Sequence, residues 1–321
     1  MQKIFKLIIT LLLVFSISGC GLLNGDIYIL FTSDVHSNIN GNITYAQLKS
    51  YKNRLEKETK NVVLVDGGDF SNTGSHMEGE IIGDTSKGLA IVEIMNEVGY
   101  DYATIGNHEF DYGFSALKDM IDTAKFQVIC ANVDYIGNNE DPFEKVKPYE
   151  IKKCGSKKIA FIGVTSPTAI LKGDDERNDV SEDGKVAVDL HGDPRDEDDD
   201  GSKLCAYMQE IINEARSKAD YVVVISHLGN NSNEILSSYD LITYTNGIDL
   251  LLDGHAHNTL NEKRLNNQGE EVQFLSTGTE LNTVGIVKIA RDGTLTADYI
   301  YGIDEVDAKT QNKIDEIVNK Y

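Results

Sequence analysis

Five short apolar runs in this chain are each followed, within a few residues, by side chains that can bind a metal ion. The runs occupy residues 27–31, 62–65, 102–105, 222–225 and 248–252, and the segments after them are Asp34-Val35-His36, Asp66-Gly67-Gly68-Asp69, Gly106-Asn107-His108-Glu109, Ser226-His227 and Asp253-Gly254-His255-Ala256-His257. Short runs of this composition are typical of buried β-strands. Loops at the carboxyl ends of strands in an α/β sheet gather on one edge, so we expect these segments to converge on a single site.

The donor atoms in these segments are oxygen and imidazole nitrogen. Five of the seven histidines lie in them, and no cysteine does. Such donors suit Zn²⁺, Mn²⁺, Co²⁺ or Fe²⁺, whereas a thiolate cluster would indicate a structural zinc. A lone histidine after a strand is more often hydrogen-bonded than metal-bound, so the hypothesis rests on five of them in the same context. The donors are numerous enough for two ions.

The order of these segments carries a family resemblance. D-x-H, G-G-D, G-N-H-E, H and G-H-x-H resemble the motifs of the calcineurin-like metallophosphoesterases, and Gly106-Asn107-His108-Glu109-Phe110-Asp111-Tyr112-Gly113 is similar to the 5'-nucleotidase branch. The resemblance covers residues 26 to about 302 and implies a single-domain, four-layer αββα sandwich, where periodicity alone indicates only α/β. It also implies phosphoester hydrolysis by a hydroxide that bridges two divalent metal ions, with no covalent enzyme intermediate.

The resemblance assigns a role to each candidate residue. Asp34, His36 and His257 would hold one ion, Asn107, His227 and His255 would hold the other, and Asp69 would bridge the two. His108 would face the scissile phosphate, where it stabilises the transition state or protonates the leaving oxygen. Asp111 would orient the His108 imidazole; alternatively, it caps the helix expected near 115–124.

Four further residues have weaker claims on the site. Asp66 and Glu109 belong to the motifs, but either could simply hydrogen-bond loop backbone. His76 and His191 lie outside the motifs, and both are expected to be exposed to solvent.

The remaining periodicity predicts two packed sheets with helices between the strands. Strands are expected at 26–33, 61–66, 101–105, 126–131, 158–164, 220–226, 248–253, 272–276 and 284–290, with a hairpin turn at 291–293 leading into 295–300. Helices are expected near 44–58, 87–98, 114–124, 203–218 and 307–320.

The amino terminus has the pattern of a bacterial lipoprotein signal. Lys3 and Lys6 precede an apolar stretch at 7–17, and Ile17-Ser18-Gly19-Cys20 resembles a lipobox. The stretch is too short to span a membrane permanently. Residues 1–19 are therefore expected to be cleaved and Cys20 lipidated, which anchors the chain outside the cytoplasm on a bacterial membrane. The alternative is an ordinary cleaved secretory signal.

The mature chain is expected to hold one metallophosphoesterase domain over residues 20–302. Cys130, Cys154 and Cys205 would be its remaining thiols, an odd number that does not support a disulfide framework, and Cys130 is expected to be buried. The 5'-nucleotidases carry a second domain that contacts base and phosphate, joined by a helix. Residues 303–321 are expected to form the start of that helix, which leaves nucleotide specificity in doubt and the presence of a separate substrate-binding chain unknown.

The net charge of −22 is unevenly distributed, because residues 174–200 carry thirteen acidic and three basic side chains. Acidity of this degree argues against nucleic-acid polymers as partners, since phosphate backbones bind basic faces. Small phosphate esters remain admissible because bound metals supply positive charge. Within the acidic insertion, about 174–201, Asp196, Asp198 and Asp200 copy the head of a calcium loop, but its twelfth position is Tyr207; a solvated charge run is the alternative.

The sequence therefore predicts a lipid-anchored di-metal phosphoesterase acting on small phosphate esters, above all nucleotides. One alternative is a phosphodiesterase for cyclic or alkyl diesters. Another is a surface lipoprotein that binds metal without catalysis.

Overall fold

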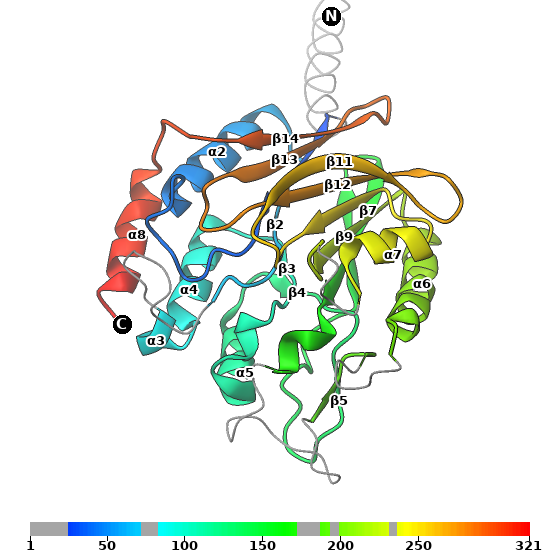
Figure 1. Ribbon diagram of the computed structural model, residues 1–321. Coiled ribbons are helices and arrows are strands. Elements are labelled where there is room, and N and C mark those ends of the chain that lie inside the picture. Colours follow the sequence, from blue (N-terminus) through cyan, green and yellow to red (C-terminus); the bar gives the residue numbers. More distant parts are fainter. Residues whose placement is uncertain (1–24, 72–82, 172–186, 193–198, 231–235) are drawn as a thin grey trace, which may run out of the picture.

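The computed structural model describes residues 25–71, 83–171, 187–192, 199–230 and 236–321. Two six-stranded sheets dominate these residues (Figure 1). In spatial order, the first sheet holds β14 (Leu295–Ile300), β13 (Val284–Ile289), β1 (Ile27–Thr32), β2 (Val62–Asp66), β3 (Tyr102–Ala103) and β4 (Gln127–Val128). The second sheet holds β11 (Thr259–Leu265), β12 (Glu271–Thr277), β10 (Leu250–Asp253), β9 (Tyr221–His227), β7 (Lys157–Thr165) and β6 (Tyr149–Cys154).

Both sheets are mixed, with a parallel centre. Strands β1 to β4 run parallel to one another, as do β7, β9, β10 and β12. Strands β13, β14, β6 and β11 add antiparallel pairs at the edges. A small two-stranded sheet pairs β5 (Asp134–Tyr135) with β8 (Val188–Asp189). The parallel strands of each sheet therefore end at a common edge.

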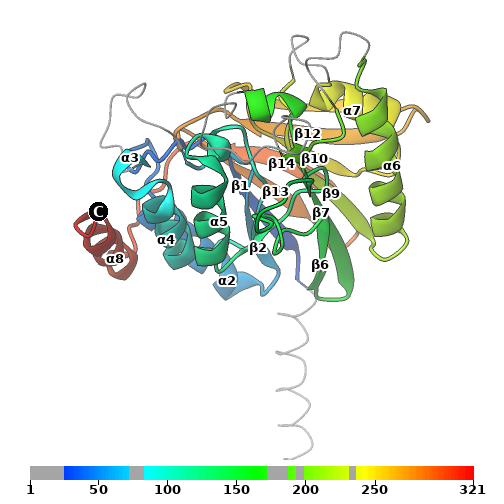
Figure 2. The same cartoon turned by 90° about the horizontal axis from the view of Figure 1, so that it is seen from below.

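Helices cover the outer face of each sheet (Figures 1 and 2). The first sheet is covered by α2 (Tyr45–Glu58), α4 (Leu89–Val98), α5 (Gly113–Thr123) and α8 (Ala308–Val318). The second is covered by α6 (Ser202–Arg216) and α7 (Ser238–Tyr244). Shorter helical turns are α3 (Gly83–Ser86), η1 (His108–Phe110) and η2 (Pro167–Leu171). The result is the expected arrangement of two mixed sheets flanked by helices.

Strand alternation divides the buried apolar side chains into three layers. Leu30 and Leu64 are cross-strand partners that face the helices outside the first sheet, while Ile29 and Val63, one residue earlier, face the second sheet. Successive side chains of a strand point to opposite faces, so an apolar run without alternation indicates a strand buried on both sides. A third cluster joins the second sheet to α6 and α7.

Most expected elements form, with differences at the edges. Strands β3 and β4 are shorter than expected. Beyond the end of β4, Cys130 and Ala131 donate backbone hydrogen bonds to the oxygens of Lys147 and Gly163. Strands β6 and β11 were not predicted. Both are edge strands with polar side chains, so they lack the apolar run that marks an inner strand. Among the helices that the structure describes, none is long and apolar enough to cross a membrane.

The three cysteines of the described residues are buried and free, whereas the sequence predicted burial of Cys130 alone. Burial raises the pKa of the Cys130 thiol to about 12. These thiols therefore behave as small apolar groups.

Candidate metal centre

The metal-binding segments come from both sheets. Those after β1, β2 and β3 leave the first sheet, while His227 ends β9 and the segment after β10 leaves the second. Hydrogen bonds join them across the sandwich. For example, the His227 imidazole bonds the carbonyl oxygen of Gly67 through Nδ1 at 2.7 Å, and the backbone N–H of His255 donates to Asp34 Oδ1 at 2.9 Å. The carboxyl ends of the two sheets thus meet at one end of the molecule.

The structure brings the seven metal-ligand candidates together in two groups. Asp34, His36, Asp69 and His257 form the first group, and Asp69, His227 and His255 form the second; the donor atoms within each lie within 4.8 Å of one another. Asp69 belongs to both. Asn107 joins the second group, since its Oδ1 lies 2.8 Å from His255 Nδ1. This is the grouping that the family resemblance implied, including the shared position of Asp69.

The chemistry of the donors fits cations between them. The contact of His227 Nδ1 with a carbonyl places the proton on Nδ1, so Nε2 presents a lone pair, yet this Nε2 faces Asp69 Oδ2 at 3.1 Å. Both atoms are then acceptors, and His227 Nε2 is buried with no hydrogen-bond partner among the described residues. The second-layer hydrogen bond that fixes a tautomer in this way is typical of metal-binding histidines. A cation between the two acceptors would satisfy both.

In the first group, too, atoms that can bind a metal lie close to one another. His36 Nε2 lies 2.9 Å from His257 Nε2, and Asp34 Oδ1 lies 3.5 Å from that atom of His257. Burial lowers the pKa of His36 to about 4 and also lowers the pKa of His257, so both rings are neutral near pH 7 and available as ligands. Residues of both groups therefore suit divalent metal ions.

Five carboxylates are buried at or beside this centre, and no Lys or Arg among the described residues pairs with any of them. They are Asp34, Asp66, Asp69, Glu109 and Asp253. Burial raises the pKa of Glu109 and of Asp253 to about 7, and it raises the pKa of Asp34 and Asp66 above their usual range. Burial would also raise the pKa of Asp69, but attraction to His227, His36 and His108 outweighs it and holds that pKa low. The site is thus short of positive charge.

Five of the seven candidates have left-handed backbone, which is uncommon outside glycine. The φ angles are 53° for Asp34, 52° for His36, 53° for Asp69, 72° for His255 and 54° for His257. Each such residue costs on the order of 1–3 kcal/mol, and strain of this kind clusters at functional sites. The loops also pack backbone to backbone: Gly68 has φ +87°, and a Cβ there would lie 2.6 Å from the nitrogen of Gly106.

His108 and Asp111 form a pair beside the first group. His108 Nδ1 lies 2.6 Å from Asp111 Oδ2, and the ring centroids of His108 and His36 lie 5.1 Å apart. The Asp111 side chain is 9% exposed and that of His108 is 24% exposed, so the imidazole is the more accessible partner. The N-cap of α5 is Tyr112, with no side-chain cap bond, so the geometry favours the orienting role of Asp111 over capping.

Asp66 and Glu109 hydrogen-bond the loops around the centre. The sequence had left this role open for both residues, beside direct participation in the site. Glu109 accepts from the backbone N–H groups of Asp69, Ser71 and Gly106 at 2.9, 2.9 and 2.7 Å. Asp66 accepts from Thr32 Oγ1 at 2.6 Å and from the Gly68 N–H at 3.0 Å. These carboxylates hold the loops that carry Asp69 and Asn107.

The sequence did not predict a hydrogen-bond network on the second sheet that lies beneath the metal-binding loops. Asp253 Oδ1 accepts from Ser238 Oγ at 2.6 Å, and Ser238 Oγ lies 2.7 Å from Ser226 Oγ. This network lies beneath the loops of His227 and His255. Ser238 belongs to α7, which was not predicted, although Ser237 and Asp240 form a capping box that marks the start of that helix.

Several predicted features fall outside the site. His191 was expected in solvent, but its Nε2 lies 2.7 Å from Asp134 Oδ2 and its ring stacks on Tyr207 at 3.7 Å, because the residue packs against α6. Asp200 is exposed, and its Oδ1 accepts from the Ser202 N–H at 3.0 Å. Cys20, His76, Asp196 and Asp198 lie outside the described residues.

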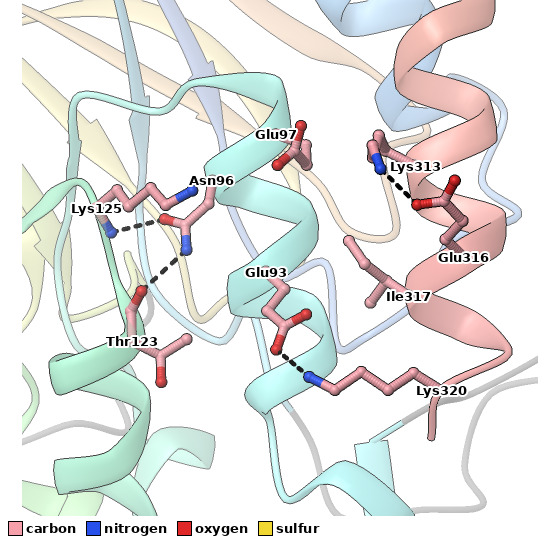
Figure 3. Close-up of a pocket in the computed structure, with 9 residues that line it drawn as sticks. All are labelled: Glu93, Asn96, Glu97, Thr123, Lys125, Lys313, Glu316, Ile317 and Lys320. Atoms are coloured by element: carbon pink, nitrogen blue, oxygen red, sulfur yellow. Dashed lines mark hydrogen bonds and ion pairs between the residues drawn. The ribbon is translucent and has the colours of Figure 1, made fainter.

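A cavity of about 560 Å³ lies away from this centre, between α4, α8 and the end of α5 (Figure 3). Its lining includes no metal-ligand candidate. Lys320 and Glu93 form an ion pair there, as do Lys313 and Glu316, so much of its charge is already matched. The lining of this cavity therefore offers no second set of metal donors.

Comparison with known proteins gives one family and a set of partial relatives. The family model described as bacterial capsule synthesis protein PGA_cap matches residues 71–264. The 2',3'-cyclic-nucleotide 2'-phosphodiesterase/3'-nucleotidase of Salmonella typhimurium is 28% identical over 264 residues, which cover 72% of this chain and 37% of that protein. The 5'-nucleotidase of Rattus norvegicus is 24% identical over 251 residues, which cover 73% and 38%. The chain thus spans less than two fifths of the length of these relatives.

Solved structures share the fold. The 5'-nucleotidase precursor from Thermus thermophilus has a TM-score of 0.72 at 21% identity, covering 92% of this chain and 59% of that one. The calcineurin-like phosphoesterase YfkN from Bacillus subtilis has a TM-score of 0.67 at 20% identity, covering 92% and 97%. The expected metallophosphoesterase fold, related to the N-terminal domain of 5'-nucleotidases, is confirmed.

Proposed function

This chain belongs to the bacterial capsule synthesis protein PGA_cap family, and we propose that it hydrolyses small phosphate esters at a centre that binds two divalent metal ions. One observation carries the proposal: two donor groups share the buried Asp69 and lie beside the His108–Asp111 pair. Ligands for metal and a positioned acid are both required for this chemistry, and a purely structural metal site would need no such pair.

The burial of the site residues shows on which side the centre is accessible. Asp34, His36, Asp69, Asn107 and His227 are buried, whereas the His257 side chain is 45% exposed, so the centre opens on the side of His257 and His108. Two divalent ions held there would activate water and neutralise phosphoryl oxygens. Asp69, whose pKa is held low, contributes the negative charge common to both ion positions.

His108 acts on the phosphoryl group and the leaving oxygen. The Asp111 carboxylate oxygen lies 2.6 Å from His108 Nδ1 and accepts the proton that this nitrogen carries. A carboxylate in this position favours the cationic ring. A cationic imidazole stabilises charge that develops on the transferring group, and it can give a proton to the departing oxygen.

The substrates we propose are nucleotides and related small phosphate esters, because several relatives are named as nucleotidases. Cyclic diesters are the second candidate, since the Salmonella relative is named as both a cyclic-nucleotide phosphodiesterase and a nucleotidase. The rival is a surface protein that binds metal without catalysis.

One assay separates these functions. Metal-stripped protein is offered a panel of nucleotides, aryl phosphates and cyclic diesters, with Zn²⁺, Mn²⁺, Co²⁺ or Fe²⁺ added back singly. Monoester turnover that depends on the added ion supports the proposal, and preference for diesters supports the second candidate. Stoichiometric metal binding with no turnover of any substrate would favour the rival.

We also propose that the chain is a lipoprotein of a bacterial membrane, anchored through Cys20 outside the cytoplasm; the sequence at 17–20 supports this. Cys20→Ala should then abolish membrane association without loss of hydrolysis. Mass spectrometry of the mature amino terminus checks it, and any first residue other than a lipidated Cys20 contradicts it.

A further inference from the structure

The end of the molecule opposite the metal centre carries a group of cations that the function does not explain. We call it the basic edge; its members are Lys60, Lys153, Lys157, Lys158, Lys288 and Arg291. They lie where the parallel strands begin, at the start of β2, at the β6–β7 turn and at the end of β13. Carboxylates lie among them as well: Asp26 pairs with Lys288 at 2.8 Å, Asp220 pairs with Lys157 at 3.6 Å, and Asp292 lies in the turn after β13, in a chain whose net charge is −22.

Contacts join several of these segments, and one of the contacts crosses the sandwich. The Lys157 ammonium lies 6.0 Å from the centre of the Tyr221 ring, and a Cβ on Gly293 would lie 3.3 Å from the Tyr221 hydroxyl. The Arg291 N–H donates to Asp26 at 3.2 Å, close to the start of β1. Figure 1 places the start of β1 near the β13–β14 turn, and Figure 2 places it near the β6–β7 turn.

Two of these positive charges are placed where they destabilise the fold. Lys153 and Lys158 are direct cross-strand partners in the β6–β7 hairpin, both exposed. Like charges directly opposite one another destabilise a strand pair. Among the described residues, no carboxylate forms an ion pair with either lysine or with Lys60. An arrangement of this kind suits an external anionic surface.

The position of the anchor indicates which surface that is. Gly25, where the described chain begins, is five positions after Cys20, and so short a segment spans at most about 18 Å. We propose that the basic edge contacts the anionic headgroups of the membrane that holds the Cys20 lipid; this inference rests on the proposed lipid anchoring. The metal centre, at the other end of strands such as β1, then faces away from the bilayer toward soluble substrates.

The chain contains no tryptophan, so a single introduced indole reports its own surroundings. Ser156→Trp places the reporter in the exposed β6–β7 turn, and Ile136→Trp places a matched reporter at a half-exposed site after β5. Each lipidated protein is reconstituted into vesicles of brominated phosphatidylcholine, with and without phosphatidylglycerol. Lipid on Cys20 is verified first by mass spectrometry.

We expect bromine to quench the fluorescence of the Ser156→Trp protein but not that of the Ile136→Trp protein. Quenching should increase with phosphatidylglycerol and decrease with salt, because screening weakens attraction to the surface. Equal quenching of both reporters, or quenching unaffected by phosphatidylglycerol, overturns the proposal.

Charge reversal supplies the second arm. Lys153→Glu with Lys158→Glu keeps a like-charge strand pair, so folding is little changed, but it removes two cations from the edge. Each lysine near an anionic leaflet contributes roughly fivefold, so the membrane-facing orientation should become less favourable by at least roughly 25-fold. Lys125→Glu with Lys309→Glu makes the same charge change on exposed residues elsewhere and should have little effect.

The outcomes distinguish the two proposals. An unlipidated Cys20 refutes the anchor, and the inference fails with it. A lipidated chain whose Ser156→Trp reporter stays unquenched refutes the basic edge alone. Hydrolysis in solution tests the metal centre separately and should be unchanged in both charge-reversal variants.

Discussion

Asp111→Asn isolates the contribution of a single charge to the proposed reaction. The substitution keeps the size of the side chain and removes the carboxylate that lies 2.6 Å from His108 Nδ1. The Asp111 side chain is only 9% exposed, so water screens the pair weakly. An amide cannot favour the cationic imidazole as the carboxylate does.

The size of the effect follows from this contact. A hydrogen bond to a charged group contributes about 1.5–3 kcal/mol net. At about 1.4 kcal/mol for each factor of ten, kcat/KM for an aryl phosphate should decrease by roughly 10- to 150-fold. Asp111 belongs to neither donor group, so the metal content should stay at the wild-type value.

A double-mutant cycle tests the reasoning. His108→Ala alone should lower kcat by about 10² or more. If Asp111 acts through His108, adding Asp111→Asn to His108→Ala should change kcat/KM by less than about twofold. Asp119→Asn, an exposed carboxylate on α5, is the matched control and should leave the rate unchanged. A full Asp111→Asn penalty in the His108→Ala background would refute the orienting role, as would wild-type kinetics of Asp111→Asn alone.

Four further outcomes are expected. Asp69→Asn should lower the metal content, measured by elemental analysis, more than Asn107→Ala does, because Asp69 belongs to both groups; equal losses would contradict the bridging position. Adding a divalent ion at about 100 times its dissociation constant to stripped protein should stabilise it by about 2.7 kcal/mol per site in denaturant unfolding, and no stabilisation would contradict binding to the folded state. Phe161→Ala, buried between the sheets and stacked on Tyr102, should cost about 3–5 kcal/mol, and a loss under about 1 kcal/mol would be too small for a filled core. The raised pKa of the buried Asp66 means that the metal-free fold binds its proton more tightly than the unfolded chain does, so stability should decrease as pH rises above the ordinary aspartate range; Asp66→Asn should flatten this dependence, measured by urea unfolding from about pH 4 to 8, and an unchanged slope would contradict the assignment.

The sequence by itself determined the inner strands and the loops that follow them. Runs such as 62–65 and 222–225 are short, apolar at every position and rich in valine, which is typical of a strand buried on both faces. The ligand side chains follow these runs directly, so their convergence could be predicted without coordinates. The donor types alone indicated divalent metal, because carboxylate and imidazole without thiolate select such ions.

Tertiary structure decided what periodicity does not encode. The runs belong to two different sheets, and only the folded chain shows that His227 reaches Gly67 across the sandwich. The edge strands β6 and β11 have polar side chains, so their positions depend on pairing with a neighbour and not on their own pattern. Ser238 and Asp253 are fifteen residues apart, and their side chains form a hydrogen bond beneath the metal centre. The spacing of the two residues in the sequence does not reveal this contact. Local pattern specifies which face of a strand is buried, whereas long-range contacts specify what it is buried against.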